Sequence, residues 1–247
     1  MTPFIAELIG TGFLILLGGG VVANVVLTGT KGNKGGWIVI ATAWALAVFV
    51  GVVIAGPYSG GHLNPAVTLA MWIAGNVGVE EALSYVLAQF LGAMLGAFVV
   101  WLVYQDHFKA TADAGAKQGV FCTAPAIRNL PVNLISETVG TFVLLFAVFY
   151  FTDATLDQEP DQAIPIGLGS LGPIPVAFVV WVIGLALGGT TGYAINPARD
   201  LGPRIVHALL PIKDKAPFDA AYAWVPVVGP LLGAALAALA FLGLGTS

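Results

Sequence analysis

Two asparagines in this chain each stand before Pro-Ala, first in GGHLNPAVT and again in GYAINPARD. The triplets are Asn64, Pro65 and Ala66, and Asn196, Pro197 and Ala198. Asparagine is favoured at a helix N-cap and proline in the first helical turn, so each triplet predicts the start of a helix. A capping asparagine keeps an amide NH₂ group that can donate hydrogen bonds to the oxygen of a neutral molecule. One copy would most often be an ordinary turn, whereas two copies in apolar surroundings predict a shared polar site.

The peptides that precede the triplets are rich in glycine, and we expect them to be extended, with backbone carbonyls that face the same site. These acceptor positions are Gly60, Gly61, His62, Thr191, Gly192 and Ala194. The positive ends of two helix dipoles would raise the cost of placing a cation there, in addition to the cost of removing its water. The predicted chemistry is hydrogen bonding to an uncharged, hydroxyl-bearing solute, without covalent steps.

Two glutamates, Glu7 and Glu137, lie inside apolar stretches, where an ionisable group is costly and implies a role. A proton relay is one interpretation. We favour a structural role, in which each carboxylate accepts hydrogen bonds from the backbone N–H groups of a glycine-rich loop. We expect His62 to brace the same region, with gating as the alternative.

The composition is that of a polytopic membrane protein. Of 247 residues, 58% are apolar and 9% are charged, and the mean hydropathy is +0.92. Soluble domains carry about 25% charged residues. The net charge of −4 says little about partners, but without a basic patch we expect no nucleic-acid partner. A single cysteine, Cys122, excludes an internal disulfide and a cysteine-based metal site, and we expect no cofactor. The first apolar stretch lacks a basic flank and is interpreted as a retained span.

Six stretches reach the roughly 20 apolar residues that a membrane helix needs. They are about 4–28, 37–57, 82–104, 132–152, 163–187 and 220–244. Two further stretches, 58–78 and 189–210, are broken by Gly and Pro, and each contains one Asn-Pro-Ala. Such backbone is tolerated at membrane depth only inside protein or beside water. We therefore expect two re-entrant half-helices.

The two halves of the chain resemble each other. Ala6–Leu16 matches Ser136–Phe146, and both segments contain Glu-x-x-Gly-Thr. Three spans and a half-span per repeat require the second copy to be inverted in the membrane. We predict an all-α membrane protein of six transmembrane helices and two half-helices. It forms a single domain, 1–247, with repeats of about 1–108 and 130–247 joined by a loop of about 105–131.

With GHLNPAVT and GYAINPARDLGPR in its two halves, the chain resembles the aquaporin superfamily, the major intrinsic proteins, over essentially its whole length. The resemblance implies a right-handed bundle and a homotetramer in which each protomer has its own pore. It also implies a selectivity filter at Trp44, Gly184, Tyr193 and Arg199, similar to that of glycerol facilitators. Gly184 would open the wall, two aromatic rings would form an apolar corner, and Arg199 would donate to hydroxyl groups. Asp200 is typical of the same branch, and we expect it to hold the loop.

The implied function is a passive channel for glycerol, similar small neutral solutes and water that excludes ions and protons. Tyr193 replaces a phenylalanine common in glycerol facilitators, and its hydroxyl could shift the preference. Dihydroxyacetone, urea and undissociated lactic acid remain open as permeants, so a channel that prefers water or small organic acids is an alternative. A coupled secondary transporter is weaker, because the spans hold no titratable cluster beyond Glu7 and Glu137. An enzyme is disfavoured, because the spans hold no nucleophile–base pair.

The resemblance also implies a location in the cell membrane, with cytoplasmic termini and an extracellular loop 105–131. The charges favour the opposite orientation, because the loops that would be outside carry the lysines, whereas 153–161 is acidic. We retain the family orientation, because the paired motifs are more specific than the charge bias.

Overall fold

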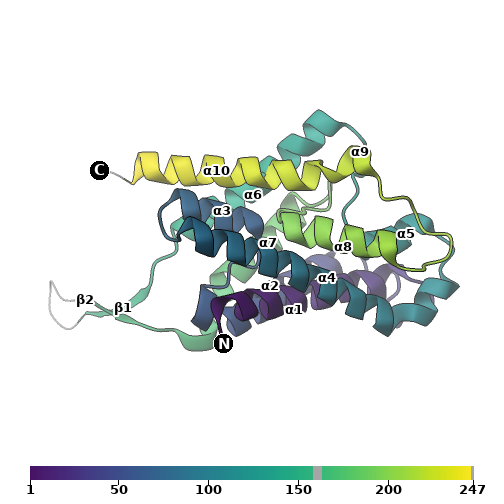
Figure 1. Cartoon of the computed structure of the whole chain (residues 1–247), viewed down its shortest axis with the longest axis horizontal. Helices are drawn as coiled ribbons and strands as arrows, with labels where there is room; N and C mark the ends of the chain where they lie inside the picture. Colours follow the sequence, from purple (N-terminus) through teal and green to yellow (C-terminus); the bar gives the residue numbers. More distant parts are fainter. Residues whose placement is uncertain (158–162, 246–247) are drawn as a thin grey trace.

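Six segments of the chain are long and apolar enough to cross a membrane in the computed structural model, which describes residues 1–157 and 163–245. They run along the long axis of the molecule, and both termini lie toward the end that carries a β-hairpin (Figure 1). The long helices are α1 (Pro3–Val26), α2 (Trp37–Ser59), α4 (Val79–Ala110), α6 (Leu130–Phe149), α7 (Ile174–Ala186) and α10 (Val225–Leu244). The predicted six-span architecture is confirmed.

Two shorter helices, α3 (Pro65–Ile73) and α8 (Pro197–Leu209), begin at the two Asn-Pro-Ala triplets. At 1.5 Å per residue their 9 and 13 residues span only about half of a bilayer core. They lie within the bundle, where α3 packs against α4 and α10, and α8 against α4 and α10 (Figure 1). Both half-helices are therefore enclosed by protein, as irregular backbone at membrane depth requires.

The two halves pack their helices in the same way, α1 against α4 and α6 against α10. Glycines make both crossings close. A Cβ on Gly96 would lie 2.4 Å from the carbonyl oxygen of Gly12, and one on Gly233 would lie 2.3 Å from that of Thr138. These distances leave no room for a side chain, so the glycines serve close helix packing.

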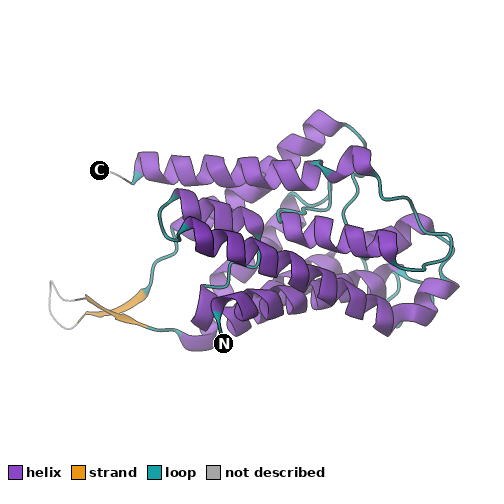
Figure 2. Ribbon diagram, in the orientation of Figure 1, coloured by secondary structure: helices purple, strands orange, loops and turns teal. Residues whose placement is uncertain are grey.

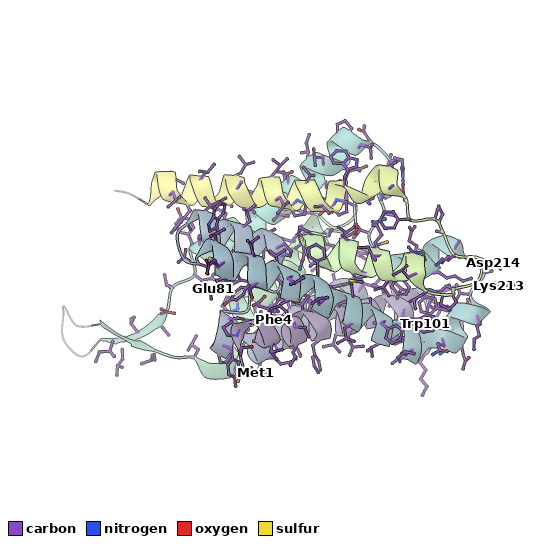
Figure 3. The ribbon with its side chains drawn as sticks, in the orientation of Figure 1. Met1, Phe4, Glu81, Trp101, Lys213 and Asp214 are labelled. Atoms are coloured by element: carbon purple, nitrogen blue, oxygen red, sulfur yellow. The ribbon has the colours of Figure 1, made fainter. Side chains whose placement is uncertain are left out.

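The outer surface is apolar and part of the interior is polar. Leucines such as Leu83, Leu87 and Leu95 on α4 are more than half exposed, whereas Glu7 and Glu137 are fully buried. Side chains project outward along the whole length of the bundle (Figure 3). This inverted distribution suits a bilayer, where lipid solvates the outer face and polar groups must find partners inside.

Two features differ from the sequence-based expectation. The predicted span 163–187 is wrong at its start, since only Ile174–Ala186 is α-helical. Residues Ala163–Ile166 form strand β2, which pairs with β1 (Ala154–Asp157) in an antiparallel hairpin (Figure 2), and Gly169–Leu171 form a 3₁₀ turn. Glycines at 167, 169 and 172 and prolines at 165 and 173 interrupt the helix, because neither residue type supports its interior. Short helices α5 (Ala114–Gly119) and α9 (Ala220–Ala223) were also not predicted.

Candidate functional site: a lumen between two half-helices

The two capping asparagines tie the half-helices together. Asn64 Oδ1 accepts from the backbone N–H of Ala66 at 2.8 Å, and Asn196 Oδ1 accepts from that of Ala198 at 3.0 Å. The amide nitrogens cross over. Asn64 Nδ2 donates to the carbonyl oxygen of Ile195 at 2.8 Å, and Asn196 Nδ2 donates to that of Leu63 at 2.9 Å. The half-helices therefore meet N-terminus to N-terminus.

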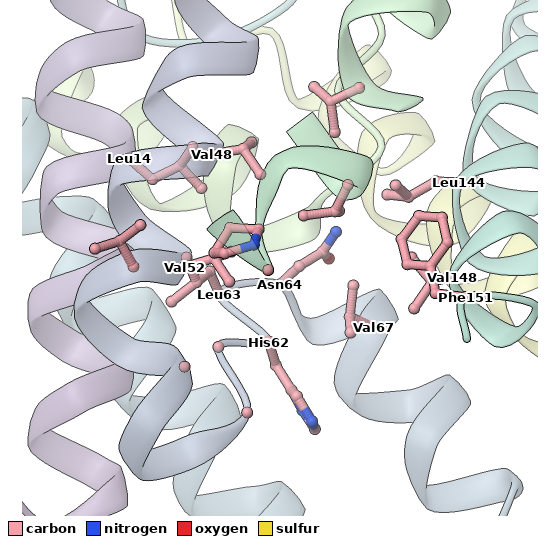
Figure 4. Close-up of a pocket in the computed structure, with 18 of the residues that line it drawn as sticks. Leu14, Val48, Val52, His62, Leu63, Asn64, Val67, Leu144, Val148 and Phe151 are labelled. Carbon is pink, nitrogen blue, oxygen red and sulfur yellow. The ribbon is translucent and has the colours of Figure 1, made fainter. Parts of the chain in front are cut away.

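This reciprocal bonding adds a structural role to the donor role expected of the asparagines. Each amide has two N–H groups, and one of them is used to hold the opposite loop. Among the described residues, no acceptor is bonded to the second N–H of Asn64 or Asn196. Both side chains line the central cavity, and Asn64 projects into it (Figure 4). Each asparagine is therefore both a clamp and a remaining donor.

The loops before the half-helices contain left-handed backbone and are not simply extended, which corrects the expectation. Leu63 and Ile195, immediately before the asparagines, have φ values of 53° and 43°. A positive φ is costly for branched side chains, so neighbouring groups must hold it. Leu63 and Ile195 occupy equivalent positions in the two repeats, because each lies one position before its asparagine.

Buried carboxylates fix both loops. Glu137 accepts from the backbone N–H groups of Ala194 at 3.0 Å and Ile195 at 2.8 Å. Glu7 accepts from those of His62 at 2.9 Å and Leu63 at 2.7 Å. The carbonyl oxygens of Leu63 and Ile195 accept from the opposite asparagine, whereas those of Gly61, His62 and Ala194 have no donor in the described part of the chain and can accept hydrogen bonds from a solute.

Glu7 has further partners that the sequence reasoning missed. Ser59 Oγ donates to it at 2.6 Å and Gln89 Nε2 at 2.7 Å. The same Gln89 nitrogen lies 3.0 Å from Thr68 Oγ1, which contacts His62 Nδ1 at 3.1 Å. Gln89 is a lone amide within an apolar span, and that isolation is the signal by which it could have been found.

The acceptor positions are not all at the lumen. Gly60, Gly61, His62 and Ala194 line the cavity, whereas Thr191 and Gly192 are absent from its lining. Thr191 is 1% exposed, and a Cβ on Gly192 would lie 3.3 Å from Thr123. The ladder is therefore shorter on the second loop than the sequence suggested.

Three positions of the predicted filter, Trp44, Tyr193 and Arg199, line one end of the cavity, whereas Gly184 is absent from the lining and lies against Tyr193. The guanidinium carbon of Arg199 lies 4.0 Å from the centroid of the Trp44 ring, a cation–π geometry. The ring of Trp44 lies against Gly18, where a Cβ would come within 2.3 Å of it. No carboxylate of the described residues forms an ion pair with Arg199, so its donors stay available to the lumen.

Gly184 has a second role that spacing alone did not suggest. A Cβ at this position would lie 2.8 Å from Cζ and 2.9 Å from the hydroxyl oxygen of Tyr193. The glycine therefore makes room for the aromatic ring beside it. The Tyr193 hydroxyl is buried and has no hydrogen-bond partner among the described residues, so it is not presented to the lumen as the polar group that the sequence suggested.

Asp200 joins α8 to the loop after α5. Its carboxylate accepts from the Thr123 backbone N–H at 2.7 Å and hydroxyl at 2.6 Å, and forms an ion pair with Arg204 at 2.8 Å. Arg204 also donates to the carbonyl oxygen of Thr123 at 2.7 Å. Arg204 and Thr123 were not singled out from the sequence, although an Asp–Arg pair four residues apart on a helix is a recognisable signal.

The cavity has a volume of about 870 Å³ and extends from the filter to the hairpin end of the molecule. Aliphatic side chains from α1, α2, α3 and α6, including Leu14, Val48, Val67 and Leu144, surround it (Figure 4). The described residues contain no group of three or more metal-ligating side chains. A mostly apolar passage with a few aligned hydrogen-bonding groups suits a small uncharged molecule that carries both carbon and hydroxyl groups.

A six-span bundle with two half-helices that face each other across such a lumen defines a passive membrane channel and not an enzyme. The chain belongs to the major intrinsic protein family, whose model matches residues 1–241. It is 50% identical over 241 residues to a glycerol uptake facilitator protein of Streptococcus pneumoniae, with 98% of each chain covered. It is 47% identical over 244 residues to a probable glycerol uptake facilitator protein of Thermotoga maritima, covering 96% of this chain and 97% of the relative.

Among solved structures, the chain resembles the aquaglyceroporin of Plasmodium falciparum, with a TM-score of 0.81 and 29% identity. The match covers 98% of this chain and 96% of that one. The predicted family and fold are confirmed.

Proposed function

We propose that this chain conducts glycerol and similar small neutral solutes, and water, down their gradients. The observation that carries the proposal is the filter end of the cavity, where the Arg199 guanidinium, over the ring of Trp44 and without a carboxylate partner among the described residues, shares the lining with the ring of Tyr193. A polyol has carbon on one edge and hydroxyl groups on the other, so it can satisfy the arginine while its CH groups contact the rings. The names of the two bacterial relatives support glycerol as the permeant.

Exclusion of ions and protons follows from the same arrangement. A cation at Asn64 and Asn196 would lose its water while facing two positive helix ends. A water molecule there would accept hydrogen bonds from both amides, and this orientation interrupts a continuous chain of proton donors. Coupled transport is disfavoured, because the carboxylates of Glu7 and Glu137 are fully buried, bonded to their loops and absent from the cavity lining.

The functional assignments follow from this proposal. The filter comprises Trp44, Gly184, Tyr193 and Arg199, with the paired Asn-Pro-Ala triplets at the centre. The carbonyls of residues 60–62 and 194 form the acceptor row, and Glu7, Glu137 and Asp200 hold the loops. We propose further that four copies assemble, each with its own pore, in the cell membrane.

The decisive experiment is osmotic swelling of proteoliposomes with glycerol, urea, lactic acid and water in parallel. We expect rapid glycerol entry with a low temperature dependence, and a pH gradient that persists. Dihydroxyacetone serves as a second carbon-bearing solute. Glycerol entry no faster than in protein-free vesicles would refute the proposal. Preferential entry of lactic acid or water would instead support the alternative channel specificity.

We also propose that both termini are cytoplasmic. Lysines and arginines favour the opposite orientation, since Lys213 lies at the far end of the molecule from Met1 and Glu81 (Figure 3). Because Cys122 is only 1% exposed, it cannot report orientation. Exposed Ala112 and Asn76, at opposite ends of α4 and its preceding loop, provide matched sites. In intact cells, an impermeant maleimide should label Ala112→Cys and not Asn76→Cys; the reverse would overturn the orientation.

A further inference from the structure

A tryptophan outside the predicted filter contacts two of its members. Trp37 is the first residue of α2, and its indole N–H donates to the carbonyl oxygen of Gly184 at 2.8 Å. Gly184 lies in the last turn of α7, where carbonyls no longer receive a helical N–H. The indole therefore satisfies a free carbonyl at the helix end and fixes the position of that end relative to α2.

The same indole packs against the ring of Tyr193, edge to face, with centroids 5.8 Å apart and an interplanar angle of 75°. On its other sides this ring is confined by glycine backbone. A Cβ on Gly188 would lie 2.5 Å from Cδ1 of Tyr193 and 2.7 Å from Cζ2 of Trp37. The three residues form one tightly packed group with Gly184.

Trp37 does not line the cavity, whereas Tyr193 does. The indole therefore contacts the ring from outside the cavity lining. If the support is removed, the ring can move back, and the passage between it and Arg199 widens.

We propose that Trp37 is a positioning residue for substrate size: it holds α7 and the Tyr193 ring at the distance that favours glycerol over bulkier polyols. This inference rests on the proposed filter assignment. The residue acts through Tyr193 and Gly184 and does not touch the solute.

The competing explanation is an ordinary interfacial anchor, the usual position of tryptophan in membrane proteins. The chain provides a matched control. Trp224 is 40% exposed, compared with 39% for Trp37, but its indole donates to the carbonyl oxygen of Ala221, three residues earlier. Loss of Trp224 should remove an anchor without affecting the filter.

The test compares the permeability ratio of glycerol to xylitol, a five-carbon polyol, in proteoliposomes of the full chain. For Trp37→Leu we expect the ratio to fall about fivefold, the factor that corresponds to one lost hydrogen bond. Trp37→Phe keeps a ring edge and loses the N–H, so its ratio should be intermediate; it also serves if the leucine variant does not fold. Trp224→Leu should leave the ratio unchanged. Equal loss of both permeabilities in Trp37→Leu would indicate an anchor and overturn the inference.

Tyr193→Leu separates a failure of the filter assignment from a failure of the positioning role of Trp37. If it changes the ratio and Trp37→Leu does not, the filter assignment stands and the positioning role is wrong. If neither variant changes the ratio, the filter assignment itself is wrong. If Trp37 acts through the ring, the effects of Trp37→Leu and Tyr193→Leu should not be additive in the double variant. Additive effects would refute the mechanism.

Discussion

A single methyl group at Gly184 should close the channel to glycerol before it closes it to water. In Gly184→Ala the new Cβ would lie 2.8 Å from Cζ of Tyr193, and ordinary contact begins at 3.4 Å. The ring end must therefore move by about 0.6 Å. Gly188 and Trp37 occupy the space on two other sides of the ring, so the movement is toward the lumen. Overpacking by one methyl group costs about 1–3 kcal/mol, and we expect glycerol permeability to fall about tenfold.

Stopped-flow light scattering of proteoliposomes measures this prediction through the glycerol-to-water permeability ratio, which is independent of the amount of protein inserted. Gly20→Ala is the control, because a Cβ there would meet nothing within 4 Å. Trp37→Leu combined with Gly184→Ala should restore part of the glycerol flux by giving the ring space behind it. An unchanged ratio in Gly184→Ala would show that the ring does not limit the passage.

Three further predictions concern the loops that carry the site. Glu7→Gln and Glu137→Gln should both lower the unfolding temperature in detergent, because each amide NH₂ would face backbone donors. The unfolding temperature should fall further for Glu7→Gln, because Glu7 accepts four hydrogen bonds. A smaller decrease for Glu7→Gln than for Glu137→Gln would contradict the mechanism. Lys215→Met should destabilise the fold by about 1–2 kcal/mol in chemical unfolding, because the ammonium group lies 2.6–2.7 Å from three carbonyl oxygens at the end of α8. Lys213 is exposed, and Lys213→Met should leave the stability unchanged. Cys122 should react with maleimide only after unfolding, because it is buried and burial raises the pKa of its thiol; rapid labelling of the native protein would show that the loop opens.

The sequence predicted the central architecture because its determinants are local. Asn before Pro predicts a helix start wherever the chain is placed, and both half-helices begin at these positions. A carboxylate within an apolar run must find donors, so the role of Glu7 could be inferred without knowing the fold. The number of spans was predicted correctly from the apolar runs, although one span begins later than expected, and the family was predicted correctly from the resemblance of the paired motifs.

What could not be predicted depends on contacts between segments far apart in the chain. The crossed hydrogen bonds of Asn64 and Asn196 join loops more than 130 positions apart. The confinement of Tyr193 by Gly188 and Trp37 depends on how α2 meets the end of α7. The β-hairpin was missed for a different reason: β2 begins an apolar run, where periodicity alone does not separate a short strand from a helix, and its partner β1 lies in an acidic connection.

The inverted repeat accounts for a proposed filter that lies at only one end of the lumen. Asn196 lies 132 positions after Asn64, and the same offset relates Arg199 to Val67 and Tyr193 to Gly61. Val67 and Gly61 line the same cavity on the opposite side of the asparagines, so the repeat places an aliphatic side chain and a glycine where the second half has a cation and an aromatic ring. The carboxylates that hold the loops, Glu7 and Glu137, are duplicated because both halves must support the same backbone. A second narrow filter, by contrast, would oblige each solute to lose its water twice along one path. In the proposed channel one constriction would provide the selectivity, and the aliphatic lining beyond the asparagines would impose no second dehydration step.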